Sequence, residues 1–100
     1  MKHYKAVISN ADNGEIYAIF EQDRTCLGKD FTSAIMDHAF FEVCRGGVDV
    51  KRVKVCVYAN EKDVCTYQLI VDEFFTNYAR LYVYRPGESP VYLRIMTIAC

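Results

Sequence analysis

The 100-residue chain has few of the residues from which catalytic and metal sites are usually built. It contains only two histidines, His3 and His38, and none of its five cysteines forms a Cys-x-x-Cys pair. A structural zinc site needs four Cys or His ligands at clustered spacing, and the chain has no such cluster. The segment CRGGVD also lacks the glycine and lysine pattern of a phosphate-binding loop. We therefore predict no metal site, no cofactor and no catalytic residues.

Long apolar runs and a strong net charge are also missing. No stretch of about 18 apolar residues is available to span a bilayer, and the N-terminal segment has no apolar run of signal-peptide length. The formal net charge of −1 argues against a general phosphate-backbone binder and gives no reason to expect membrane adhesion. The absence of a targeting or membrane-spanning segment predicts a cytoplasmic protein, of a cell or of an infected host. In such a protein the five cysteines, an odd number, are expected to be reduced thiols.

Apolar and aromatic residues are abundant instead. The hydrophobic share is 52%, with eight tyrosines and six phenylalanines, which is enough for a core and argues against disorder. We see no repeat, linker or low-complexity tract. Residues 1–100 are therefore predicted to form a single domain.

Alternating apolar residues predict strands in three regions. Residues 3–11 and 15–23 predict a hairpin around Asn13-Gly14, the strongest short turn signal. Residues 50–58 alternate from Val50 to Tyr58 and predict a central strand. Residues 80–96 predict a closing hairpin around a Pro/Gly-rich turn.

Residues 31–47 carry helical periodicity. Asp30 is suited to cap the first amides, and Gly46 is suited to end the helix in a left-handed conformation. The apolar positions that recur every four residues are Phe31, Ile35, Ala39 and Val43.

Residues 61–79 fit two patterns. The segment from Val64 to Val71 also fits a strand, but a longer set of apolar residues falls on one helical face, with Asn60 as an N-cap, so we predict a second helix. That face holds Val64, Tyr67, Val71, Phe74, Phe75 and Tyr78. The predicted fold is α+β with the order β-β-α-β-α-β-β, about five mostly antiparallel strands and two helices packed on one face.

The register of the closing hairpin decides where its tyrosines point. A four-residue loop would mix aromatic and aliphatic residues on both faces, whereas a five-residue loop from Pro86 to Pro90 leaves one face purely aliphatic. We therefore predict the five-residue loop, which places Tyr84 beside Tyr92 and Tyr82 beside Arg94.

If both helices cover the aliphatic face, the opposite face collects tyrosines and basic residues. The two-residue turn at Asn13-Gly14 would add Tyr4, Tyr17, Ile8 and Ile19 to this face. The predicted partner-binding residues are Tyr17, Arg52, Lys54, Tyr58, Tyr82, Tyr84, Tyr92 and Arg94.

This face allows three interpretations. It fits a solvated sheet face, because Tyr and Arg have good strand propensity, but simple alternation should then make the residues at Ile8, Ile19, Met96 and Ile98 polar. Apolar and aromatic residues rimmed by charge suggest contact with a protein, or self-association. Tyrosines beside basic residues also suit single-stranded nucleic acid, although the central strand lacks the aromatic motif of RNA-recognition domains.

We predict a small non-enzymatic protein-binding module, an inhibitor or adaptor of the kind that phages and mobile elements encode. The alternative is a single-stranded nucleic-acid-binding domain that uses the same face. A minority interpretation is a thiol enzyme using Cys26, which lies between Arg24 and Lys29 before a predicted helix, where a thiolate is favoured. That enzyme would also need a base, and the sequence does not bring His38 to Cys26.

Overall fold

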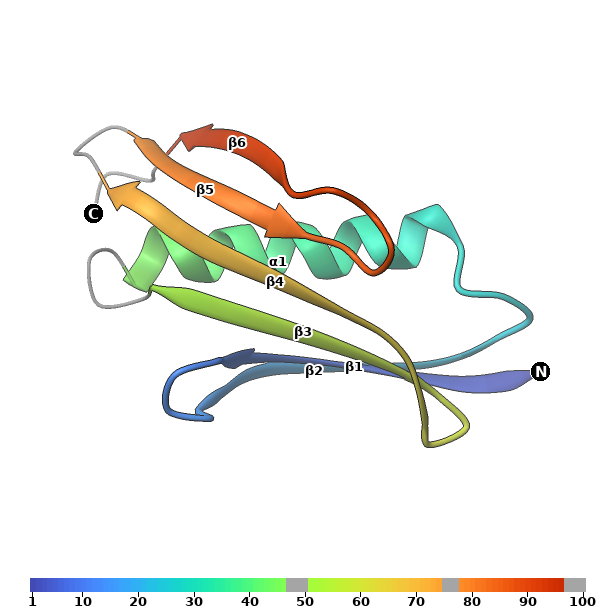
Figure 1. Cartoon of the computed structure of the whole chain (residues 1–100). Coiled ribbons are helices and arrows are strands. Elements are labelled where there is room, and N and C mark those ends of the chain that lie inside the picture. The colour runs from blue at the N-terminus through green and yellow to red at the C-terminus, as the bar shows by residue number, and fades with distance from the viewer. Residues whose placement is uncertain (47–50, 75–77, 97–100) are drawn as a thin grey trace.

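The described chain forms one six-stranded antiparallel sheet with a single helix against one face (Figure 1). The computed structural model describes residues 1–46, 51–74 and 78–96. The elements in chain order are β1 (Lys2–Asn10), β2 (Ile16–Arg24), α1 (Lys29–Gly46), β3 (Arg52–Ala59), β4 (Lys62–Phe74), β5 (Tyr78–Tyr84) and β6 (Val91–Met96). The strand order across the sheet is β2-β1-β3-β4-β5-β6.

The predicted fold with two helices and about five strands is wrong, because residues 62–74 form β4. The helical interpretation left Leu69 off its apolar face, yet Leu69 is fully buried between Val53 and Val83 of the two neighbouring strands. Asn60, predicted to cap that helix, instead forms a two-residue turn with Glu61 between β3 and β4. Both turn residues have positive φ angles, 48° and 68°.

Some predicted positions lie outside the described residues. These are Gly47, Val50, Phe75 and Ile98 and, for their side chains only, Phe74 and Met96.

The helix predicted at residues 31–47 is confirmed as α1. Its apolar stripe faces the sheet, and the buried hydrophobic residues are Phe31, Ile35, Met36, Ala39, Val43 and Cys44. Asp30 lies within the first turn instead of before it, because the helix begins at Lys29. The Arg24 guanidinium donates to Asp30 Oδ1 at 2.6 Å and lowers the pKa of that carboxyl.

The first hairpin has a different register from the one predicted. Asn10 Oδ1 accepts hydrogen bonds from the amides of Asp12 and Asn13, and a bulge follows the pairing of Ile8 with Ala18. The connection is therefore longer than two residues. A shift of one residue exchanges the two faces of a strand, so Tyr4 and Ile8 are buried on the helix side instead of lying on the opposite face.

The closing hairpin also differs in register, but its faces are as predicted. Tyr82 pairs with Tyr92 and Arg80 with Arg94, and the connection runs over residues 85–90. The predicted pairing of Tyr84 with Tyr92 is wrong by two positions. A two-residue slip keeps every side chain on its face, because the side-chain period of a strand is two. Gly87 in this loop has a φ of +71°, a left-handed conformation that glycine adopts without steric strain.

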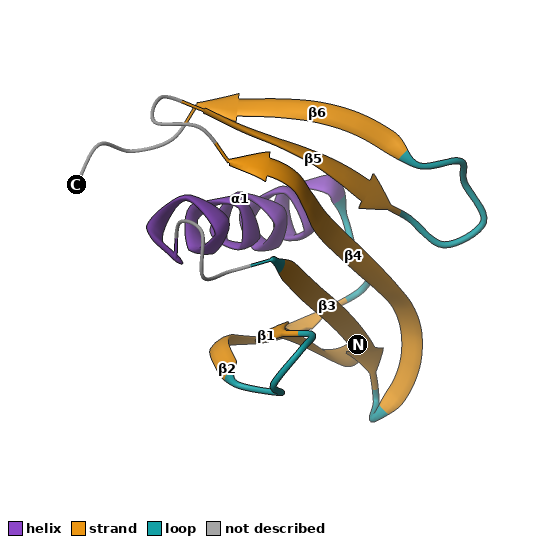
Figure 2. Cartoon of the chain, turned by 60° about the vertical axis from the view of Figure 1, so that its left-hand side comes forward, coloured by secondary structure: helices purple, strands orange, loops and turns teal. Residues whose placement is uncertain are grey.

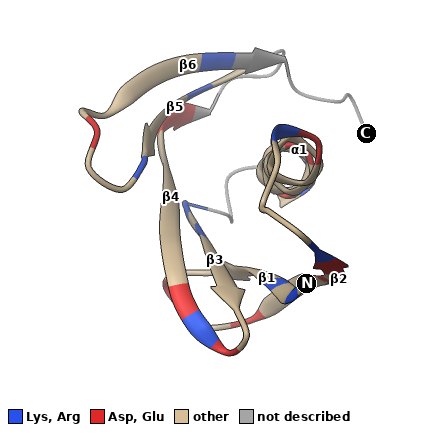
Figure 3. Cartoon of the chain, turned by 90° about the vertical axis from the view of Figure 1, so that its right-hand side faces the viewer, with Lys and Arg blue, Asp and Glu red and all other residues tan. Residues whose placement is uncertain are grey.

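The sheet curves around α1, so its helix side is concave and its other side convex (Figures 2 and 3). We call the convex side the open face. The core on the concave side is made largely of β-branched and other aliphatic side chains, each contributing about 1.5–3 kcal/mol by burial. The strand residues most fully buried there are Ala6, Ile8, Val53, Val55, Val57, Leu69, Ala79, Leu81 and Val83. No helix in the described part of the chain is long and apolar enough to cross a membrane.

Candidate functional site

The strand register brings four large side chains together on the open face. Ile70 on β4 pairs with Tyr82 on β5, which pairs with Tyr92 on β6, and Tyr84 lies two residues beyond Tyr82. Arg52 continues the same row on β3, since it pairs with Ile70. We call this surface the tyrosine patch and define it as Ile70, Tyr82, Tyr84 and Tyr92 with Arg52, Arg80 and Arg94 around them.

The tyrosine rings of the patch are exposed, whereas the neighbouring residues along β5 are buried. Tyr82, Tyr84 and Tyr92 are 36%, 40% and 46% exposed, whereas Leu81 and Val83 are fully buried. Alternation along β5 thus separates a core face from an aromatic solvent face. Tyr82 and Tyr92 meet edge to face, with their ring centroids 5.1 Å apart.

Guanidinium groups border the rings. Arg80 lies 5.8 Å from the Tyr92 ring centroid, and its Nη2 is 3.3 Å from an Asp72 carboxylate oxygen and 3.0 Å from one of Glu73. Arg94 lies 4.2 Å from the ring centroid of Tyr78. These cation–π contacts hold charged groups against aromatic rings, where each contributes about 0.5–1 kcal/mol at an exposed site.

A shallow hollow lies next to the patch. It has a volume of about 440 Å³ and is lined by Thr66, Gln68, Ile70, Tyr84, Arg85 and Pro86. Its lining combines aliphatic and aromatic surface with two neutral polar side chains and the guanidinium of Arg85.

The predicted site residues do not form one surface. Arg52 borders the patch and contacts Gln68 Oε1 at 3.5 Å, and Lys54 pairs with Gln68 in the next row. Tyr58 is also on the open face, but six residues from Arg52 along β3, about 20 Å at the usual rise of a strand. There it lines a separate hollow with His3 and Glu21, and the adjacent Cys56 thiol raises the pKa of the Tyr58 phenol.

Tyr17 is not on the open face. The bulge in the first hairpin turns it to the helix side, where Asn10 Nδ2 donates to its hydroxyl at 3.0 Å. It lines a hollow with Glu42 and Arg45 of α1. Its predicted position with Tyr82 and Tyr92 is therefore wrong.

Three members of this region were missed by sequence reasoning. Ile70 and Tyr78 were assigned to a helix, and Arg80 was left out of the predicted site. The alternation of Thr66, Gln68 and Ile70 against Cys65, Tyr67 and Leu69 is the signal that would have placed Ile70 on the open face.

Titratable groups elsewhere are engaged in local contacts. The buried Glu42 carboxylate accepts from Arg45 at 2.6 Å and lies 3.3 Å from His38 Nε2. The His38 ring also packs on Phe20 and Phe41. Among the described residues no group of three or more His, Cys, Asp or Glu side chains is placed to hold a metal ion.

Comparison of the chain with protein-family models, with curated proteins and with solved structures gives no significant match.

Proposed function

We propose that the chain is a non-enzymatic binding module, an inhibitor or adaptor that docks a partner protein on the tyrosine patch. The observation that carries this proposal is the contiguous group of Ile70, Tyr82, Tyr84 and Tyr92 on the exposed convex face. Tyrosine and arginine are the residue types that dominate the energetics of protein interfaces. Their apolar centre and charged border have the usual anatomy of such an interface.

The charges on the border favour a partner with complementary charge. Arg80 is matched by the carboxylates of Asp72 and Glu73, whereas Arg52 and Arg94 have no carboxylate within 4.0 Å among the described residues. The patch therefore has an excess of positive charge. A partner surface with an apolar or aromatic centre and carboxylates at its rim is complementary. A second copy of the same patch is not complementary, because like charges would meet.

Several contacts favour a protein over single-stranded nucleic acid. A base needs an open ring face on which to stack. Tyr82 and Tyr92 instead pack edge to face, and the guanidinium of Arg80 lies against the Tyr92 ring.

The test uses a photo-crosslinking amino acid, p-benzoylphenylalanine, at position 84 in cells that naturally contain the protein. We expect a crosslinked protein adduct that resists nuclease and is lost when Tyr82→Ala and Tyr92→Ala are added. The matched control has the crosslinker at Ile16, which is 57% exposed on the edge strand at the far side of the sheet.

Four outcomes would overturn the proposal. They are no adduct from position 84, an equal adduct from position 16, an adduct destroyed by nuclease, and an adduct with the mass of two copies of this chain. The third would point to nucleic acid and the fourth to self-association.

A further inference from the structure

The single helix leaves part of the concave face uncovered. α1 packs most closely on β1 and β3, and no second helix covers the other strands within the described residues. Tyr67 on β4 and Leu93 on β6 are only partly buried. Val64, at the start of β4, is 50% exposed despite its aliphatic side chain.

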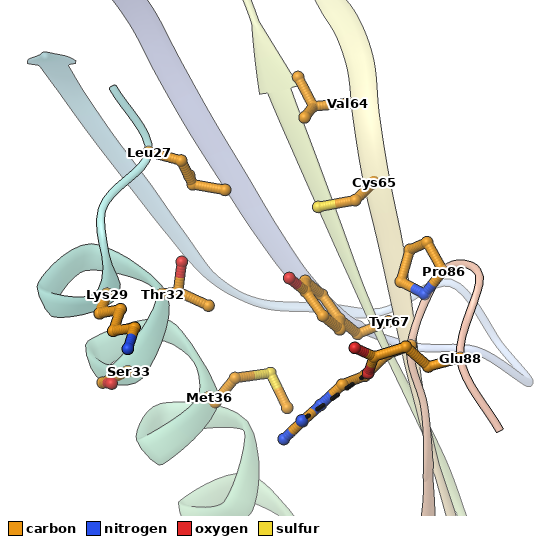
Figure 4. A pocket seen from close by; sticks show the side chains of 11 residues that line it. Leu27, Lys29, Thr32, Ser33, Met36, Val64, Cys65, Tyr67, Pro86 and Glu88 are labelled. Atoms are coloured by element: carbon orange, nitrogen blue, oxygen red, sulfur yellow. Dashed lines mark ion pairs between the residues drawn. The ribbon is translucent and has the colours of Figure 1, made fainter. Parts of the chain in front are cut away.

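This gap forms a cleft of about 640 Å³ between the first turns of α1 and the start of β4 (Figure 4). Leu27, Thr32 and Met36 lie on one side, and Cys65 and Tyr67 on the other. The β5–β6 loop closes one end with Pro86 and Glu88. Its volume is within the range of about 300–1,000 Å³ that is typical of small-molecule sites.

The walls of the cleft are mainly apolar. Its floor, formed by Cys65 and Tyr67, carries no charge near neutral pH. Burial raises the pKa of the Cys65 thiol and of the Tyr67 phenol, so both groups stay protonated. An aliphatic or aromatic body can therefore contact the floor without desolvating a charged group.

Cations stand on opposite walls of the cleft. Lys29 belongs to the first turn of α1, and Arg85 begins the β5–β6 loop. Lys29 has no ion pair among the described residues. Arg85 lies 3.9 Å from Glu88, which is the longest ion-pair distance among those residues. Because Arg85 and Glu88 are both exposed, this ion pair is weak and an anion could replace Glu88.

We propose that this cleft binds a small carboxylic acid, with its apolar body against Met36, Cys65 and Tyr67 and its carboxylate between Lys29 and Arg85. Most of this site is on the other side of the sheet from the tyrosine patch, although Arg85 and Pro86 also line the hollow beside Tyr84. Lys29 lines the cleft and not that hollow, so Lys29→Gln tests this proposal separately from the docking proposal. The charge of the two cations and the apolar walls between them select an amphipathic anion over a neutral or cationic molecule of the same shape.

The test is an NMR titration of the full chain with decanoate, below its micelle concentration. Decylammonium and 1-decanol serve as probes of equal length and different charge. We expect saturable shifts at the amides of Leu27, Cys65 and Tyr67 with decanoate, and weaker binding of the other two probes. Lys29→Gln and Arg85→Gln should each weaken decanoate binding about two- to five-fold, as for a solvent-exposed ion pair.

Two further variants keep the test independent of folding defects. Lys54→Gln removes a cation from the open face and should leave decanoate binding unchanged. Val64→Phe adds a ring at an exposed rim position and should reduce binding without unfolding the chain. Absence of saturable shifts, shifts centred on Tyr82 and Tyr92, or equal binding of decylammonium would overturn the proposal.

Discussion

Tyr82 on β5 and Tyr92 on β6 lie directly opposite each other, with their ring planes at 67°. The pair is on the convex side of the sheet, and the neighbouring pair, Leu81 and Leu93, points to the concave side. One hairpin therefore supplies both core packing and the centre of the proposed docking surface. The two contributions can be separated by substitution.

Leu81→Ala should destabilise the chain far more than Tyr82→Ala. Leu81 is fully buried, and truncating such a leucine costs about 2–5 kcal/mol of unfolding free energy. Tyr82→Ala removes an exposed cross-strand contact and should cost about 0.5–1.5 kcal/mol. Urea unfolding of the two variants makes the comparison. Equal losses would mean that Tyr82 is packed in an interior.

The contact between the two tyrosines should be measurable as a coupling energy. An edge-to-face pair contributes about 0.5–1.5 kcal/mol beyond its buried area. A double-mutant cycle with Tyr82→Ala and Tyr92→Ala should recover a value in that range from urea unfolding. The cycle of Tyr82→Ala with Tyr17→Ala is the control and should give no coupling, because Tyr17 is on the other side of the sheet.

Glu61→Gly should stabilise the chain. Glu61 has a φ of +68° in the turn between β3 and β4, and a left-handed conformation costs an L-residue about 1–2 kcal/mol that glycine does not pay. Asn60 before it would complete an Asn-Gly turn and keep its hydrogen bonds to His3. We expect a higher thermal midpoint in calorimetry. As a control, Glu88→Gly has no positive φ angle to relieve, and a gain of the same size there would refute this explanation.

His3 should make stability fall as the pH rises above 6.5. The hydrogen bond that the His3 imidazole donates to the Asp23 carboxylate, helped by Glu21, raises the pKa of His3 above its ordinary value of 6.5. The folded chain then holds the imidazole proton more tightly than the unfolded chain does. This stabilisation is fully present below pH 6.5 and is lost as the pH rises through the folded-state pKa.

The measurement compares urea unfolding of the wild type and Asp23→Asn at about pH 5 and about pH 9. At about pH 5 the wild type should be more stable than Asp23→Asn, and this difference in unfolding free energy should be smaller at about pH 9. A constant difference between the two proteins would contradict the role of His3. The variant His3→Gln should remove most of the pH dependence of the difference.

The four thiols of the described residues should react with iodoacetamide in the order of their exposure. Cys26 is exposed and should be labelled first, Cys56 and Cys65 more slowly, and the buried Cys44 last. Mass spectrometry of digested samples gives the four rates. A labelling rate at Cys26 far above that of an unfolded-chain cysteine would support the thiol-enzyme interpretation.

The secondary structure could be predicted where the apolar residues fit the helical period or the strand period but not both. The helix at Lys29–Gly46 was found because Met36 and Phe40 directly follow Ile35 and Ala39 on one apolar stripe, whereas a strand would place adjacent residues on opposite faces. In β4 the apolar residues fit both periods, and pairing with β3 and β5 decided for the strand. That pairing is a property of the tertiary structure, and the alternation from Cys65 to Ile70 could not by itself outweigh the competing helical spacing.

The residues of the candidate site were predicted correctly only where their place depends on the face of the sheet and not on the exact cross-strand pairing. Tyr82, Tyr84, Tyr92 and Arg94 were assigned to one face although their pairing was wrong by two positions. Tyr17 was misplaced because the Asn10 side chain lengthens the first turn by its own hydrogen bonds. A one-residue change reverses a strand's faces and a two-residue change does not.

Strands β3 to β6 follow one another both in the chain and across the sheet, and only the pairing of β1 with β3 joins distant segments. Every residue of the tyrosine patch belongs to this meander, while β1, β2 and α1 supply much of the core. The same meander also contributes core residues from Val53 to Val83, at the strand positions that alternate with those of the patch. An insertion or deletion of one residue in any of these strands would therefore exchange its interior and exterior side chains, so the patch and the interior cannot change independently there.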